Sequence, residues 1–216
     1  MRALVIGAGG HAHVVGDILQ QMDSSGAGLE LIGYLDDNPD LIGQQIQGLP
    51  ILGSLTSLPE IAHDVVIVAI GDNVVRHRLF SALKRKGESF VTACHPSAVI
   101  APGVRIGPGT AICAGVVVNP GSVIGSNVIL NTGCIADHHN RIEDHAHIAP
   151  GVHLGGGVSV GEGALVGIGA NVMPQCRVGA WTVVGGGALV RTDLPDGVVA
   201  TGLPARAIRK QIDERT

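Results

Sequence analysis

The second half of the chain carries a hydrophobic repeat of six residues. An aliphatic residue returns at every sixth position from Ile100 to Val190, without insertion or deletion, and only Ala136 interrupts the series. Four places after each of these positions the residue is usually small or β-branched, with Asn140 and Leu194 as exceptions. Six is a multiple of the strand period, so both positions point to one side of an extended chain. With Gly, Asn, Asp and Pro in between to turn the chain, the repeat predicts a parallel β-helix.

The residues before about Cys94 show a different pattern, in which apolar runs alternate with amphipathic segments. Strands are predicted at 3–6, 29–35, 65–70 and 90–93, and helices at 12–22 and 74–86. The first helix should bury one face, formed by Val14, Val15, Ile18 and Leu19. Strands that alternate with helices form a parallel sheet, so we expect a small Rossmann-like α/β domain at 1–94. The six-residue repeat predicts a second domain, a β-helix at 95–216.

Three segments rich in glycine or polar residues follow the predicted strands of the first domain. The carboxyl ends of parallel strands meet at one edge of the sheet, where ligands bind. There, glycines let a phosphate approach the backbone, the first helix offers free N–H groups, and a carboxylate can bind a ribose or a base. The pattern therefore predicts a nucleotide site made of Gly9, Gly10, His11, Asp36, Asp37, Gly71 and Asn73.

The glycine motif is not a complete dinucleotide fingerprint. Ala12 stands where the last glycine is usual, and Asp36 lies further downstream than the typical spacing of about 20 residues. The predicted sheet also has room for only one of the two mononucleotide-binding halves that make up a dinucleotide-binding fold. We therefore do not expect a nicotinamide site, and the alternative is that the glycines only form a turn.

Composition excludes several classes of function. The chain has 216 residues, a net charge of -4 and 2% aromatic residues, whereas a nucleic-acid binder needs a basic face and stacking rings. No apolar run approaches the roughly 20 residues of a membrane span, and the start of the chain does not resemble a signal peptide. The cysteines lack metal-ligand spacing, and we expect reduced packing residues of a cytoplasmic protein at Cys94, Cys113, Cys134 and Cys176.

The repeat resembles the hexapeptide-repeat acyltransferase superfamily. Its combination with a small nucleotide domain resembles the nucleotide-sugar acetyltransferases, which include perosamine and bacillosamine N-acetyltransferases and sialic acid O-acetyltransferases. The resemblance covers essentially the whole chain and rests on the segments 5–11, 35–37, 69–73, 95–98, 131–133, 137–138, 147–151 and 202–206. It implies a left-handed β-helix with three hexads per coil, a homotrimer, acetyl-CoA as co-substrate and a nucleotide-linked amino sugar as acceptor.

The repeat is least regular at residues 136–141, and two histidines stand at this turn. Acyl transfer from a thioester needs a base, and an imidazole suits that role near neutral pH. The resemblance assigns the base to His138 and implies that a ring N–H of His147 bonds the thioester carbonyl. These two residues are one and a half hexads apart, so on a three-sided coil they face different ways. We therefore expect an active site shared between chains.

In the family an acidic residue commonly follows the base and orients its ring, whereas His139 occupies that place here. Asp137, Glu143 or Asp144 could take over this role, and the sequence leaves the three open. Asp137 is included with His138 and His147 in the predicted catalytic set.

The resemblance also implies a binding site for coenzyme A. It assigns the site to Asn131, His147, Gly156, Ile168 and Gly186, with Arg206 as a phosphate partner. Arg209 and Lys210 could assist it, or all three cations could belong to a solvated terminal helix that caps the open end of the solenoid.

Three further functions are compatible with the sequence alone. The γ-class carbonic anhydrases have similar solenoids whose interface histidines hold zinc, but six-residue steps such as His147 to His153 land on successive faces. No three histidines of one chain can then converge on one ion, and we expect no metal. A sialic-acid-type O-acetyltransferase and a non-catalytic nucleotide-sugar scaffold also stay open. The interpretation favoured here is acetyl transfer to an amine, at C4 of the nucleotide-linked sugar.

Overall fold

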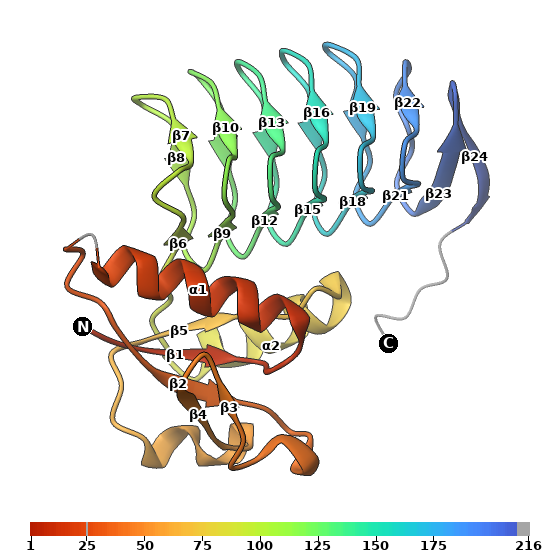
Figure 1. Cartoon of the computed structure of the whole chain (residues 1–216). Helices are drawn as coiled ribbons and strands as arrows, with labels where there is room; N and C mark the ends of the chain where they lie inside the picture. The colour runs from red at the N-terminus through yellow and green to blue at the C-terminus, as the bar shows by residue number, and fades with distance from the viewer. Residues whose placement is uncertain (25, 211–216) are drawn as a thin grey trace. The chain divides into compact units, whose positions relative to one another are not determined.

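The computed structural model describes residues 1–24 and 26–210 of the chain (Figure 1). It divides into two compact units, the first ending at Pro96 and the second beginning at Ser97. Within the described residues, no helix combines the length and the apolar character that a bilayer crossing requires.

The first unit is built on a five-stranded sheet with the strand order β3-β4-β2-β1-β5. All neighbouring strands are parallel except β3, which runs antiparallel to β4. The elements are β1 (Arg2–Ile6), α1 (Gly10–Ser24), β2 (Glu30–Leu35), the 3-10 helix η1 (Pro39–Leu41), β3 (Gln45–Ile46), β4 (Leu49–Gly53), the 3-10 helix η2 (Leu55–Glu60), β5 (Val65–Val68), α2 (Asn73–Arg85) and β6 (Ala93–Cys94).

Sequence periodicity located β1, α1, β2, β5 and α2 to within a few residues, but it missed β3 and β4. The strand predicted at 90–93 is also wrong in extent, because Phe90 makes only an isolated bridge to Val66 and β6 has two residues. β3 and β6 have two residues each, which leaves no alternation to detect. β4 has five residues, but Pro50 lies within it and weakens the strand signal.

The side chains of the central strands alternate between two apolar layers. Leu4 and Ile6 of β1 belong to a cluster that includes Phe80 and Leu83 of α2. Val15, Ile18 and Leu19 of α1 are buried as well, but the predicted fourth member of this face, Val14, is 39% exposed, so that part of the prediction is wrong. On a helix, residues 14 and 15 differ by about 100° in direction, which is enough to turn Val14 out of the contact.

The order of the strands creates a switch point at β1. The chain leaves β1 for β2 on one side and later returns to β5 on the other side. In open parallel sheets the crevice at such a reversal, beyond the carboxyl ends of the strands, is where ligands bind. The turn that follows β1 and the loop that follows β5 flank this point.

The second unit is a left-handed parallel β-helix with three faces, whose coils are stacked in a row (Figure 1). Each strand pairs in parallel with the third strand after it, so one coil contains three hexads.

The three faces are named here after one of their strands. The β9 face contains β9 (Ala111–Ile112), β12 (Ile129–Leu130), β15 (His147–Ile148), β18 (Leu165–Val166) and β21 (Val183–Val184). The β10 face contains β7 (Val99–Ile100), β10 (Val117–Val118), β13 (Ile135–Ala136), β16 (His153–Leu154), β19 (Asn171–Val172) and β22 (Leu189–Val190). The β11 face contains β8 (Arg105–Ile106), β11 (Val123–Ile124), β14 (Arg141–Ile142), β17 (Ser159–Val160) and β20 (Arg177–Val178).

From β9 to β22 the second residue of each short strand is buried in the interior, whereas Ile100 of β7 and Ile106 of β8, in the first coil, are half-buried. Val118, Ala136 and Leu154 are consecutive members of one column, and each is at most 2% exposed. Ala136, which interrupts the repeat, therefore still occupies its core position. The predicted hexapeptide solenoid and its inward positions are confirmed.

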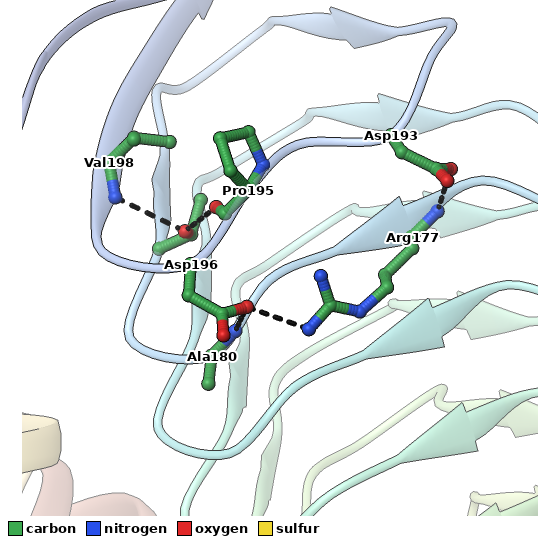
Figure 2. A network of polar contacts seen from close by, with 7 residues as sticks. Arg177, Ala180, Asp193, Pro195, Asp196 and Val198 are labelled. Atoms are coloured by element: carbon green, nitrogen blue, oxygen red, sulfur yellow. Dashed lines mark hydrogen bonds and ion pairs between the residues drawn. The ribbon is translucent and has the colours of Figure 1, made fainter.

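Polar side chains close the last coil of the solenoid (Figure 2). The carboxylate of Asp196 accepts hydrogen bonds from the Ala180 backbone N–H at 2.9 Å and from the Arg177 guanidinium at 2.7 Å, and Asp193 accepts one from the Arg177 backbone N–H at 2.8 Å. The bond from Arg177 lowers the pKa of Asp196. These carboxylates accept hydrogen bonds from backbone N–H groups that would otherwise be left for a further coil to pair with.

Beyond this closure the chain forms a hairpin of β23 (Val198–Gly202) and β24 (Ala205–Lys210), in which β23 pairs with β21. Arg206, Arg209 and Lys210 all lie on β24, so the terminal helix considered from the sequence is wrong for the described residues. A strand pairs directly with the open edge of the last coil, which a helix cannot do.

Candidate active site

The turn at residues 137–139 is fixed by two buried polar side chains. Ser122 and Asn140 occupy small-residue positions of the interior, one coil apart, and both are 1% exposed. The Ser122 hydroxyl and the Asn140 amide both donate to the Asp137 carbonyl oxygen, at 3.0 and 2.6 Å. Asn140 also accepts the Val158 backbone N–H at 2.7 Å. The polar exception in the repeat thus replaces apolar packing with hydrogen bonds that pin this turn.

The Asp137 carboxylate holds the same turn from outside. Its Oδ1 accepts the His138 backbone N–H at 2.8 Å and the Asn119 side-chain amide at 3.0 Å. These two bonds, led by that from Asn119, lower the pKa of Asp137. Asp137 therefore acts on the backbone of His138.

The imidazole of His138 is exposed and lies against Gly156, which occupies the matching corner of the next coil. A Cβ built on Gly156 would be 2.6 Å from His138 Nε2 and 2.5 Å from Cε1, so the ring occupies the space that any other residue would fill. His138 Nδ1 lies 3.0 Å from Nδ1 of His139, and the two rings meet edge to face with centroids 5.2 Å apart. The base candidate thus packs with Nε2 and Cε1 directly against the Gly156 backbone.

None of the three carboxylates considered from the sequence contacts the His138 ring. Asp137 bonds the backbone, and Asp144 accepts the Ser126 N–H at 2.7 Å. Glu143 and Asp144 line a pocket of about 330 Å³ on the β11 face. Within the described part of the chain, His139 is the polar side chain in contact with the His138 imidazole.

His147 begins β15 and belongs to a different group of residues. Asn131 Oδ1 accepts the Thr132 N–H at 2.8 Å, which turns the amide nitrogen toward His147 Nε2 at 3.2 Å. Because this amide nitrogen can only donate, Nε2 of His147 accepts, and the ring carries its proton on Nδ1. A hydrogen bond from His147 to a carbonyl would therefore come from Nδ1.

The predicted coenzyme-binding residues fall at two corners of the coil. Gly156 lies between the β10 and β11 faces, together with His138. Ile168, which is 64% exposed, and Gly186 stack one coil apart between the β9 and β10 faces, where Asn131 also lies. One chain thus brings His138 and Gly156 together, and Asn131 and His147 together, but places the two groups at different corners.

The predicted nucleotide-binding residues gather at the switch point of the first unit. Asp36 Oδ2 accepts the Ala8 N–H at 2.7 Å and its Oδ1 accepts the Asn38 N–H at 2.9 Å, while Asp37 accepts the Leu55 N–H at 2.9 Å. Both carboxylates therefore shape the loops at this edge, and Asp36 ties the glycine turn to β2. Gly9 and Gly10 are exposed at the start of α1, and Gly71 is exposed at the end of the β5 loop.

Arg76 lies beneath this edge, and sequence reasoning missed it. It is 1% exposed and donates from Nη1 to the Ile70 and Gly71 carbonyls at 3.1 and 3.3 Å. Burial lowers the pKa of Arg76 to about 9. Burial and the charge of Arg76 lower the pKa of His11 from 6.5 to about 4, so this ring is neutral. The available signal was the placement of Arg76 on the same face of α2 as Phe80.

Asn119 was also missed, although it stands at the position that matches Asp137 in the preceding coil. The coil places residues three hexads apart side by side, and this rule would have identified Asn119 as a partner. The same rule relates Ser122 to Asn140 and His138 to Gly156.

Fold and site together define a hexapeptide-repeat acyltransferase with an attached Rossmann-like sheet. Residues 2–83 match the family of the PglD N-terminal domain. A mutant of GDP-perosamine N-acetyl transferase from Caulobacter crescentus, solved with CoA and GDP-perosamine, is 41% identical over 96% of this chain and 96% of that chain, with a TM-score of 0.89. The acetyltransferase domain of PglB from Neisseria gonorrhoeae is 33% identical over 96% and 99%, with a TM-score of 0.89.

A third solved structure, WeeI from Acinetobacter baumannii AYE, is 26% identical over 96% of this chain and 100% of that chain, with a TM-score of 0.84. None of the curated proteins compared with the chain matches it. The chain belongs to the nucleotide-sugar N-acetyltransferases of the hexapeptide-repeat superfamily. The family resemblance inferred from the motifs is confirmed.

Replacing Asn140 by Ala should destabilise the solenoid and misplace the 137–139 turn. The change leaves the Val158 N–H without its buried acceptor, which costs about 1–3 kcal/mol in the free energy of unfolding. Urea unfolding measures this loss. Cys176→Ala is the matched control, because Cys176 is buried at the same place two coils further on and should cost less. Equal losses in the two variants would contradict the pinning role.

Stability should fall as the pH drops from about 6.5 to 4, in part through His11. In this window the unfolded chain protonates the side chain and the folded chain does not, because the pKa of His11 is lowered to about 4. The difference corresponds to a loss on the order of 3 kcal/mol. Unfolding by urea at pH 7 and pH 4.5 should show a smaller pH effect for His11→Gln than for the native chain. His13→Gln, on the exposed side of α1, is the matched control for the loss of one imidazole.

Proposed function

We propose that the protein transfers the acetyl group of acetyl-CoA to the C4 amine of a nucleotide-linked amino sugar, with guanosine diphosphate as carrier. The observation that carries this proposal is the contact of the His138 imidazole with the Gly156 backbone on a preorganised turn. The identity of 41% to an enzyme solved with GDP-perosamine and CoA supports the choice of substrate and carrier. Acyl transfer to a hydroxyl of a sialic-acid-type sugar has no such support.

The proposed reaction is a direct attack on the thioester. The amine nitrogen forms a bond to the acetyl carbon while Nε2 of His138 takes a proton from that nitrogen. The bond from carbon to sulfur then breaks, its electron pair stays on sulfur, and the proton on His138 passes to the departing thiolate. The Nδ1–H of His147 would donate to the thioester oxygen as negative charge develops there.

The proposal includes a homotrimer as the active species. His138 and Gly156 lie at the corner between the β10 and β11 faces, whereas His147 lies on the β9 face and Asn131 at its edge, so the two groups would face each other across two chains. The exposure of His138 in the single chain supports this arrangement, because acyl transfer is favoured in a site shielded from water.

The first unit would hold the nucleotide at its switch point, with the exposed Gly9 and Gly10 against the diphosphate and the α1 N-terminus directed at it. His11, Gly71 and Asn73 complete this proposed site, with Asp36 and Asp37 at its edge. Arg206 on β24 would pair with a phosphate of coenzyme A. The need for acetyl-CoA and the four free cysteines support a cytoplasmic location.

Purified protein should release free thiol from acetyl-CoA in the presence of a GDP-linked 4-amino sugar. His138→Asn should lower kcat by about 10²- to 10⁴-fold, the contribution of a general base, without lowering the melting temperature. Melting curves with GDP-, UDP-, dTDP- and CMP-sugars identify the carrier, because a ligand raises the melting temperature when it binds the folded state. Thiol release that is unchanged in His138→Asn, or that occurs only with hydroxyl acceptors, would contradict the proposal.

Mixed trimers of His138→Asn and His147→Ala chains should recover activity. In random mixtures roughly a quarter of the interfaces combine a native His138 with a native His147 from the neighbour. The rate of thiol release after joint refolding measures this recovery, and sedimentation verifies the trimer. Each variant refolded alone provides the control, which should stay inactive. A complete lack of recovery would show that both histidines act within one chain.

A further inference from the structure

We propose that His139 is the residue that positions the base, by accepting a hydrogen bond from Nδ1 of His138. The proposal rests on the function assigned above and specifies how its catalytic imidazole is oriented. The observation behind it is the 3.0 Å separation between the two Nδ1 atoms, together with the described hydrogen bonds of the Asp137 carboxylate, which come from the His138 backbone N–H and from Asn119 and not from the His138 ring.

Two Nδ1 atoms at this separation must share one proton. Two lone pairs would repel each other, and so would two N–H groups, so one ring donates and the other accepts. If His138 donates, its Nε2 is unprotonated and can take a proton from the reacting amine. If His139 donates, Nε2 of His138 carries the proton and cannot act as a base. Catalysis therefore requires that His139 accepts at Nδ1 and carries its own proton on Nε2.

The backbone and a second glycine hold His139 in this position. Its φ angle is +58°, a left-handed conformation, and its N–H donates to the Pro120 carbonyl at 3.0 Å. A Cβ on Gly121 would be 2.7 Å from Cδ2 of the His139 ring, so this ring packs on a glycine of the preceding coil, as His138 packs on Gly156 of the next. The pair of rings is therefore held between two glycines.

A neutral imidazole orients the base but supplies no negative charge. The charged group of this turn, Asp137, is bonded to the His138 N–H and to Asn119, and the two glycines under the rings carry no titratable group. Proton uptake by His138 during catalysis is then supported by the hydrogen bond to His139 and, through space, by the charge of the Asp137 carboxylate, which makes no hydrogen bond to the ring.

Three substitutions at position 139 separate these effects, because each places an atom where Nδ1 now lies. Asn offers an oxygen acceptor and tolerates a left-handed backbone, Leu offers a methyl group, and Asp offers a charged acceptor. We expect His139→Asn to retain most of kcat and His139→Leu to lose at least tenfold, within the roughly 10²- to 10⁴-fold that a general base contributes. In His139→Asp the acid limb of the pH profile should move to higher pH, because negative charge stabilises the protonated imidazole.

The deciding measurement does not depend on activity. In full-length protein labelled with ¹⁵N-histidine, imidazole nitrogen shifts should show His138 protonated at Nδ1 and His139 protonated at Nε2, with signals assigned by their loss in the position-138 and position-139 variants. In His139→Leu the proton of His138 should move toward Nε2. His153→Leu, which removes an exposed imidazole from β16, should change neither ring.

An unprotonated Nδ1 on His138 in the native protein would overturn the proposal. Equal kcat values for His139→Asn and His139→Leu would overturn it as well. If the native protein acetylates none of the amino sugars, the proposed function fails, and the nitrogen shifts alone then decide whether His139 accepts the bond.

Discussion

The hydrogen bonding of each strand to the matching strand of the next coil is the constraint from which the site follows. This pairing makes every corner of the coil a stack of equivalent positions, so a polar side chain in one coil can satisfy the backbone of the next. Asn140 bonds the Val158 N–H in this way, and Thr110 bonds the Val128 N–H at 3.2 Å. A regular solenoid thus provides a rigid frame in which exceptions to the repeat become precise supports for side chains at the surface.

The 137–139 turn shows how such exceptions are combined. In the interior, the side chains of Ser122 and Asn140 donate hydrogen bonds to the Asp137 carbonyl. On the outer side of the coil, the Asp137 carboxylate accepts the His138 backbone N–H. Burial of Asn140 would be unfavourable without partners, since an unpaired buried amide costs roughly 1–3 kcal/mol, but all its described bonds are made to this turn and to the neighbouring coils. The stability of the solenoid and the position of the His138 turn therefore depend on the same side chain.

The first unit uses a different solution to hold its loops. A fully buried guanidinium, that of Arg76, supports the carbonyls that follow β5, and the carboxylate of Asp36 supports the glycine turn that follows β1. Taking the Arg76 guanidinium from water is unfavourable in itself, and its hydrogen bonds to the Ile70 and Gly71 carbonyls offset part of that cost. Among the described residues, none beyond the adjoining backbone lies within 4 Å of a Cβ built on Gly9, Gly10 or Gly71, the exposed glycines of this edge.

The sequence by itself determined the solenoid and most of the first sheet, because period and strand alternation are local properties of the chain. The three hexads per coil came from the family resemblance. The sequence also identified the irregular turn at His138. Only the tertiary structure decided which partners surround that turn: the carboxylates expected to orient the ring lie on the backbone or on another face, and His139 is in contact instead. The tertiary structure likewise showed strand β24 where a terminal helix had been one alternative, and it revealed Arg76 beneath the loop that follows β5. Such contacts join residues far apart in sequence, and their geometry depends on how coils and loops stack, which periodicity does not specify.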